Sequence, residues 1–171
     1  ISTLNCLKKL GVKVKLYKNK CEITGLGLNG FNYKKNIILD TGNSGTLARL
    51  ILGLLIHSQK KIKIIGDKSL SKRDFLRVIL PLEKFGAKFK PYAKNKLPLK
   101  ILGSEFLKPI NYIENRGSAQ CKSAVIFAAL NTPGRTFIKA KKSRNHTELF
   151  LKHLNLPIKI IKKKSYDLIE V

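Results

Sequence analysis

Hydrophobic and polar residues along this chain alternate with two periods, that of an amphipathic helix and that of a strand. Segments with these two periods follow one another in a recurring order. Residues 4–10 have the spacing of an amphipathic helix, and residues 12–16 alternate Val, Lys, Val, Lys and Leu, which is the period of a half-buried strand. A turn rich in Lys and Asn then leads to a second strand at 21–25. The same order of helix, break, strand, turn and strand recurs at 75–103 and at 149–171.

Each of these three helices is followed by a residue that adopts left-handed backbone at low cost. The three residues are Gly11, Gly86 and Asn155. Helix ends, strand alternation and spacing agree three times, so chance similarity between unrelated αβ segments is a poor explanation. The pattern therefore predicts an internal repeat.

Two copies of a different half-unit lie between these segments, each a strand, a helix and a strand. Their predicted elements are a strand at 37–40, a helix at 45–56 and a strand at 61–65, then a strand at 110–113, a helix at 118–130 and a strand at 136–139. A whole unit is thus βαβαββ. The predicted fold class is α/β, with repeated βαβαββ units forming one three-fold pseudo-symmetric lobe whose first unit is incomplete. The expected division is the second half of unit one at 1–30, unit two at 31–105 and unit three at 106–171, with the missing half-unit before Ile1.

Composition narrows the classes of protein that fit this pattern. The 171 residues, 43% of them hydrophobic, are enough for a proper core, and no apolar run approaches the ~20 residues of a membrane span. Residues 1–4 lack the basic start and apolar stretch of a signal peptide, so we expect none here. Three cysteines without C-x-x-C spacing indicate reduced, semi-buried thiols in a cytoplasmic protein, without a metal site; a catalytic role for Cys121 is the minor alternative.

The net charge of +25 allows two interpretations. Such an excess is typical of proteins that bind nucleic acid or another polyanion. The lysines, however, are spread along strands and loops, with no Arg-rich helix, no RNP-type aromatic strand and no zinc-finger spacing. A lysine-rich surface without nucleic acid is therefore the favoured interpretation.

Chemistry-bearing residues gather in four turns that each lead from a strand to a helix. In the first, at 40–49, free backbone N–H groups and the helix dipole favour an anion at the helix start. Gly45 permits a close approach to the backbone, and Arg49 either holds the loop through Asp40 or reaches the ligand. No G-K-[ST] follows, so this is not a Walker P-loop, and a plain structural turn is the alternative.

The second turn, at 66–74, places Arg73 just before a helix, where its guanidinium can hold a carboxylate or phosphate by two hydrogen bonds. We expect Asp74 to cap that helix. In the third turn, at 117–123, Ser118 is either an N-cap or a ligand-binding hydroxyl. Gln120 offers a neutral amide in the first helical turn, suited to bridging two ligands.

The fourth turn, at 142–148, has Asn145 and Glu148 at the spacing of a capping box, which would leave Ser143 and Arg144 exposed before the helix. His146 at the helix start is more often structural than a catalytic base. In a pseudo-symmetric lobe, all four turns can lie on one face. That face would bind small phosphorylated or carboxylated molecules, whereas a non-catalytic scaffold would have little use for four such turns.

The same four turns carry motifs that resemble the enolpyruvyl transferases and, among them, the 5-enolpyruvylshikimate-3-phosphate synthase family. The motifs are N-S-G-T-x-x-R at 43–49, G-D-x-S-L-x-K-R at 66–73, S-A-Q-x-K-S-A at 118–124 with L-N-T-P-G at 130–134, and S-R-N-H-T-E at 143–148. They occur in the family's order across nearly the whole chain. One departure is Asp74, where the family usually has Pro.

The resemblance implies a two-lobed, monomeric cytoplasmic enzyme without cofactor, metal, nucleic acid or membrane, which closes over shikimate-3-phosphate and phosphoenolpyruvate and is the target of glyphosate. It implies that Gly45, Arg73 and Gln120 contact phosphoenolpyruvate. It also implies that shikimate-3-phosphate is contacted by Ser118, Ala119, Gln120, Ser143 and Arg144, and that the first loop is shaped by Asn43, Thr46 and Arg49. The family's acid–base residues lie in the other lobe, so we expect no catalytic residue here and no turnover by this chain alone.

Overall fold

The computed structural model describes residues 1–28 and 30–171, which form five α-helices, one 3₁₀ helix and ten strands. The helices are α1 (Ser2–Lys9), α2 (Gly45–Leu54), η1 (Leu70–Lys72), α3 (Leu76–Lys84), α4 (Ala119–Leu130) and α5 (His146–His153). The strands are β1 (Lys13–Leu16), β2 (Cys21–Thr24), β3 (Ile37–Asp40), β4 (Ile62–Ile65), β5 (Lys88–Pro91), β6 (Leu99–Leu102), β7 (Asn111–Glu114), β8 (Phe137–Lys141), β9 (Lys159–Lys162) and β10 (Tyr166–Glu170).

Two four-stranded sheets share one topology. In the first, the order is β3-β4-β6-β5, with β3 parallel to β4 and the other pairs antiparallel. In the second, the order is β7-β8-β10-β9, with β7 parallel to β8 and the other pairs antiparallel. Each sheet with its two helices is a βαβαββ unit, called unit two (β3 to β6) and unit three (β7 to β10) below. The predicted repeat and α/β fold class are confirmed.

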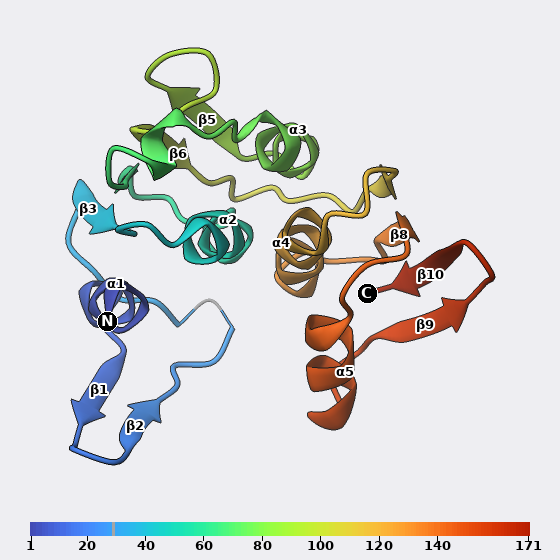
Figure 1. Ribbon diagram of the computed structural model, residues 1–171, viewed down its shortest axis with the longest axis horizontal. Coiled ribbons are helices and arrows are strands. Elements are labelled where there is room, and N and C mark those ends of the chain that lie inside the picture. The colour runs from blue at the N-terminus through green and yellow to red at the C-terminus, as the bar shows by residue number, and fades with distance from the viewer. Residues whose placement is uncertain (29) are drawn as a thin grey trace.

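The elements before β3 match the second half of such a unit, with α1 followed by the antiparallel hairpin β1–β2. We predicted half-buried strands there, and that prediction is wrong, because Leu16 and Ile23 are 63% and 51% exposed. No second layer of the described residues covers this hairpin, so its alternating side chains stay in solvent. Figure 1 shows it at the edge of the molecule, in blue.

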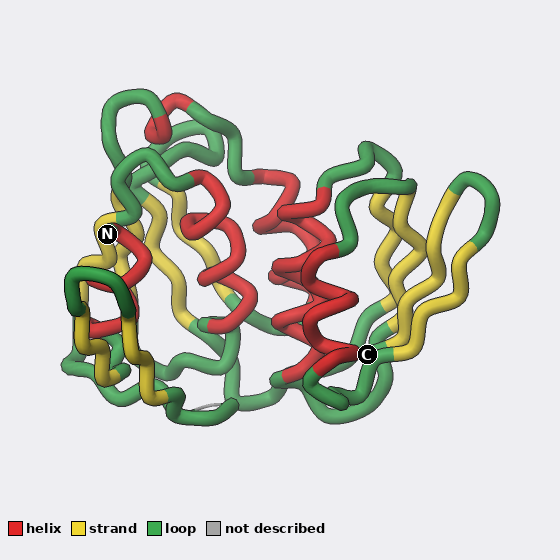
Figure 2. The backbone as a smooth tube through the Cα atoms, turned by 60° about the horizontal axis from the view of Figure 1, so that its bottom comes forward, coloured by secondary structure: helices red, strands yellow, loops and turns green. Residues whose placement is uncertain are grey.

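Helices α2 and α4 lie side by side at the centre, between the two four-stranded sheets (Figures 1 and 2). Both helices are largely apolar around their circumference, as expected for helices buried on most sides. Gly53 permits their close approach, because a Cβ there would stand 2.1 Å from the backbone oxygen of Ala124. The contact between the two units is therefore a backbone-close helix pair.

Helices α1, α3 and α5 form the outer set, and each is followed by the predicted left-handed residue. The φ angles of Gly11, Gly86 and Asn155 are +91°, +117° and +54°. These turns direct each chain segment from its helix into the antiparallel strands that complete the unit.

Cys6 and Cys121 are buried, whereas Cys21 is exposed rather than semi-buried, and all three are free thiols. Across residues 1–28 and 30–171, no helix has the length and apolar character needed to cross a membrane. Those residues also contain no cluster of three or more His, Cys, Asp or Glu side chains able to hold a metal ion.

Candidate anion-binding site

The four predicted turns follow β3, β4, β7 and β8, which are the parallel strands of the two units. The carboxyl ends of parallel strands point the same way, so each pair of turns lies at one edge of its sheet. The close packing of α2 against α4 then brings the two edges together. The turns that were predicted to gather on one face do so.

The first turn is organised by local hydrogen bonds. The carboxylate of Asp40 accepts the backbone N–H of Gly42 at 2.9 Å, and the hydroxyl of Ser44 caps α2 by accepting the N–H of Leu47 at 3.2 Å. Asp40 therefore does not hold Arg49, contrary to one of the two roles considered for that arginine. Arg49 instead turns across the helix start.

The first and second turns are joined through Asp67. The Asn43 amide donates to the Asp67 carboxylate at 2.7 Å, and the N–H of Asp67 donates to the backbone oxygen of Gly42 at 2.9 Å. The second carboxylate oxygen of Asp67 accepts the N–H of Leu70 at 2.7 Å. Asn43 thus fixes the shape of the double turn.

Two guanidinium groups stand over the start of α2. A Cβ built on the buried Gly45 would lie 2.9 Å from Nη1 of Arg49 and 3.0 Å from Nη1 of Arg73. Burial lowers the pKa of Arg49, and the nearby charges of Arg77 and Arg73 lower it further. Within the described residues, neither Arg49 nor Arg73 forms an ion pair with a carboxylate. The site therefore carries uncompensated positive charge at a helix start, an arrangement that favours an anion.

Gln120 connects this cluster to unit three. Its Oε1 accepts from Nη1 of Arg49 at 3.0 Å, and its Nε2 donates to the hydroxyl of Thr46 at 2.8 Å. Ser118 is the N-cap of α4, since its hydroxyl accepts the N–H of Cys121 at 3.3 Å. We expected the Gln120 amide to bridge two ligands. In this structure both its oxygen and its nitrogen bond to other side chains of the protein.

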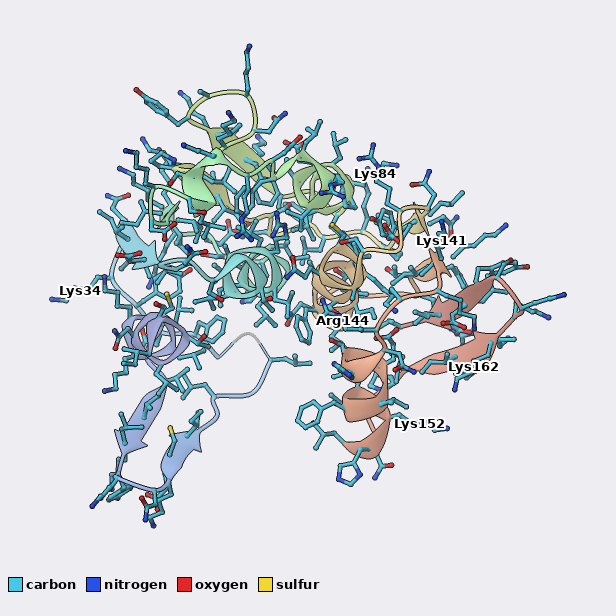
Figure 3. The ribbon with its side chains drawn as sticks, viewed as in Figure 1. Lys34, Lys84, Lys141, Arg144, Lys152 and Lys162 are labelled. Atoms are coloured by element: carbon cyan, nitrogen blue, oxygen red, sulfur yellow. The ribbon has the colours of Figure 1, made fainter. Side chains whose placement is uncertain are left out.

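Arg144 reaches the same region from the start of α5. A cavity of about 220 Å³ is lined by side chains from α2, α4 and α5, among them Thr46, Ala119, Gln120 and Arg144. Figure 3 shows Arg144 near the centre, beside α4, whereas the labelled lysines lie around the periphery on several elements. Ser143 is half-buried with its hydroxyl oxygen enclosed, so it is not exposed as predicted.

The two capping predictions have opposite outcomes. The N-cap of α3 is Phe75 and not Asp74, but the carboxylate of Asp74 accepts the N–H of Leu76, the first residue of α3, at 2.6 Å, so Asp74 does hold the helix start. The capping box at Asn145 and Glu148 is wrong, because Asn145 makes no side-chain cap and Glu148 is buried against Lys122 on α4. The carboxylate is taken up by a tertiary ion pair and cannot serve its own helix start.

Sequence reasoning missed two contacts beside the site. One is the ion pair of Lys122 with Glu148, and the other is a hydrogen bond of 2.7 Å between the hydroxyls of Ser123 and Thr147. A signal was present for the first, because Lys122 is the only charged residue in the helix 119–130.

Repeated βαβαββ units with arginines over converging helix starts define the class of an enolpyruvyl transferase-type α/β protein. The family model of EPSP synthase (3-phosphoshikimate 1-carboxyvinyltransferase) matches residues 1–170. The chain therefore belongs to the EPSP synthase family.

Individual relatives agree with this assignment. The chain is 42% identical over 174 residues to the 3-phosphoshikimate 1-carboxyvinyltransferase of Caldicellulosiruptor bescii, covering 100% of this chain and 40% of that protein. It is 42% identical over 168 residues to that of Streptococcus agalactiae, covering 95% and 39%. The solved EPSP synthase of Acinetobacter baumannii superposes with a TM-score of 0.87 at 32% identity, covering 98% of this chain and 38% of that one. The chain thus spans about two fifths of the length of the relatives it matches.

Proposed function

We propose that this chain forms most of one lobe of a 3-phosphoshikimate 1-carboxyvinyltransferase. That enzyme transfers the enolpyruvyl group of phosphoenolpyruvate to the 5-hydroxyl of shikimate-3-phosphate in the biosynthesis of aromatic amino acids. The observation that carries the proposal is the convergence of Arg49, Arg73, Gln120 and Arg144 on adjacent helix starts. The names of the relatives agree with it.

The reaction needs a site that holds two anions together. The 5-hydroxyl oxygen bonds to C2 of the enol while C3 gains a proton and the hydroxyl loses one. Phosphate then leaves from C2 as C3 loses a proton, which restores the double bond. Charge moves between carboxylate, phosphate and C2 during these steps, so fixed guanidinium and N–H groups lower the barrier.

Phosphoenolpyruvate is assigned to the unit-two side of the site. Arg73 supplies a guanidinium fork that forms no ion pair within the described part of the chain. Gly45 leaves space for a ligand oxygen at the helix start, and Gln120 borders the same space. Arg49 and Thr46 hold Gln120 in place, and Asn43 holds the turn. A planar fork suits a carboxylate or phosphate better than an ammonium group does.

Shikimate-3-phosphate is assigned to the unit-three side. Arg144 and the start of α4 at Ala119 line the cavity with Gln120, and Ser118 and Ser143 lie in the two turns beside them. A phosphate at the start of α4 would meet backbone N–H groups and one guanidinium.

The acid–base residues are assigned to a second lobe, and no catalytic residue is assigned to this chain. Residues 1–30, 31–105 and 106–171 are proposed as half of unit one, unit two and unit three. An uncovered outer helix supports a further half-unit, since Phe85 after α3 is fully buried whereas Leu154 after α5 is 49% exposed. We propose further that the enzyme is monomeric, cytoplasmic and free of cofactors, and that it belongs to the enzyme class that glyphosate targets.

The test is an assay of a full-length enzyme containing this chain, with both substrates and detection of enolpyruvylshikimate phosphate. Turnover by the full-length enzyme and none by the chain alone is the expected result. Failure of the full-length enzyme to form product would reject the proposal. A salt-dependent shift with oligonucleotides that exceeds any response to shikimate-3-phosphate would favour nucleic-acid binding instead.

A further inference from the structure

The start of α5, which carries Arg144, is not fixed by its own residues. In α2 and α4, the N-cap serines Ser44 and Ser118 hold the first turn. The N-cap of α3, Phe75, makes no such bond, but the carboxylate of Asp74 just before it accepts the N–H of Leu76. Asn145, the N-cap of α5, makes no such bond. Something else has to hold that first turn.

Two polar contacts from α4 take this place. Nζ of Lys122 lies 2.6 Å from Oε1 of Glu148, and the two side chains are 0% and 3% exposed. The hydroxyls of Ser123 and Thr147 lie 2.7 Å apart. We call these four residues the α4–α5 clasp. It joins the first turns of the two helices whose starts carry Gln120 and Arg144.

Packing alone does not require the charged half of the clasp. In unit two, Ala48 of α2 corresponds to Lys122 of α4, because each is four residues after its capping serine. Val78 of α3 corresponds to Glu148 of α5, because each is two residues after the first residue of its helix. Both Ala48 and Val78 are fully buried. Buried apolar residues therefore suffice at these two positions in one unit. A buried ion pair is a costly alternative that adds little net stability but demands one geometry.

We propose that Lys122 and Glu148 are positioning residues: their ion pair fixes the start of α5 on α4 and so places Arg144 relative to Gln120. This inference rests on the proposed function for the identity of the anion that Arg144 binds. It adds a role for two residues that do not line the cavity shared by Arg144 and Gln120. Losing the clasp would affect shikimate-3-phosphate and leave the Arg73 side undisturbed.

The experiment uses the full-length enzyme with Lys122→Met and Glu148→Leu together. Replacing both charges with apolar groups avoids leaving one charge buried alone, so the variant should melt at or above the wild-type temperature. We expect the KM for shikimate-3-phosphate to rise roughly tenfold, because small displacements of a binding group are costly. The KM for phosphoenolpyruvate should stay within about twofold of wild type, because Arg73 and Gly45 keep their surroundings.

A matched control separates positioning from general loss of stability. Leu151→Val in α5 trims the same helix interface without touching the clasp, so it should lower the melting temperature and leave both KM values unchanged. A folded double variant with wild-type KM for shikimate-3-phosphate would overturn the proposal.

A second variant keeps the test decisive if the double apolar variant does not fold. Lys122→Arg with Glu148→Asp keeps both buried charges but alters the geometry of the pair, away from the cavity lining, and should raise the same KM by a smaller factor. An unchanged KM there would equally overturn the proposal. Wild-type enzyme without turnover would instead reject the proposed function, and the amide NMR shifts of Arg144 in the two variants would then decide the positioning role without substrate.

Discussion

Unit two and unit three have the same topology and differ in the chemistry at their equivalent turns. A capping serine begins the inner helix of each unit, Ser44 in one and Ser118 in the other. In unit two, the guanidinium groups of Arg49 and Arg73 lie over the helix start. In unit three, the neutral amide of Gln120 lies in the first turn of the helix, and Arg144 approaches from the turn before α5. The comparison teaches that the architecture fixes where the helix starts lie, whereas a few side chains give each start its own charge and hydrogen-bonding groups.

The largest effect expected from this comparison is loss of the unit-two guanidinium. Arg73→Ala should lower kcat/KM by roughly two to three orders of magnitude, because a charge-assisted contact to the substrate is lost. Steady-state kinetics of the full-length enzyme measures it. Arg77→Ala, one helical turn further on, is the control and should change kcat/KM little. Near-normal turnover with Arg73→Ala would contradict the assignment.

The second-largest effect is expected from a change at the contact between α2 and α4, which joins the two units. Gly53→Ala should lower the free energy of unfolding by about 1–3 kcal/mol, because the new Cβ would meet the Ala124 backbone oxygen at 2.1 Å and α2 must shift from α4. Urea unfolding measures the change. Gly25→Ala is the control, since a Cβ there meets nothing within 4 Å. Equal stability of the two variants would show that the units do not depend on this approach.

A smaller effect should follow from filling the space at the unit-two helix start. Gly45→Ala places a methyl group 2.9–3.0 Å from the arginine tips, which can give way because they are the ends of flexible side chains. We expect the KM for phosphoenolpyruvate to rise roughly tenfold with little change in stability. Ala119 is the natural comparison, because unit three already has a methyl group at its equivalent position. An unchanged KM would contradict the assignment of phosphoenolpyruvate to the space beside Gly45.

The smallest predicted effect concerns pH. Burial lowers the pKa of His57 in unit two, whereas His146 and His153 in unit three are exposed. The folded state therefore disfavours the charged form, so stability is fully present above the ordinary pKa of 6.5 and decreases as pH falls below it. Urea unfolding of wild type and His57→Gln between neutral and mildly acidic pH should show a smaller loss in the variant. Identical pH profiles would contradict the prediction.

The sequence pattern predicted the features that depend on local periodicity, which are the helices, the strands and the helix ends. Helix and strand alternation defined both βαβαββ units, and Gly11, Gly86 and Asn155 were assigned their backbone correctly because that preference is local. The four turns were also found, since each has Gly, Ser or Arg at a strand-to-helix junction. Their convergence followed from the repeat.

The features that could not be predicted from the sequence depend on contacts between residues that lie far apart along the chain. The spacing of Asn145 and Glu148 matched a capping box, yet the Glu148 side chain pairs with a lysine on another helix. In the same way, Arg49 had Asp40 as a nearby partner in sequence but contacts Gln120 of the other unit. The exposed hairpin β1–β2 has an alternating pattern whose burial requires a layer that the described residues do not provide.

Backbone amide NMR of the chain during titration with shikimate-3-phosphate tests the central claim most directly. Amides at the starts of α4 and α5, Ala119, Gln120 and Arg144 among them, should shift together and saturate along one curve, and those of Gly45 and Arg73 should respond to phosphoenolpyruvate added afterwards. Shifts confined to surface lysines, or a separate curve for each turn, would mean that the helix starts do not form one site for two anions.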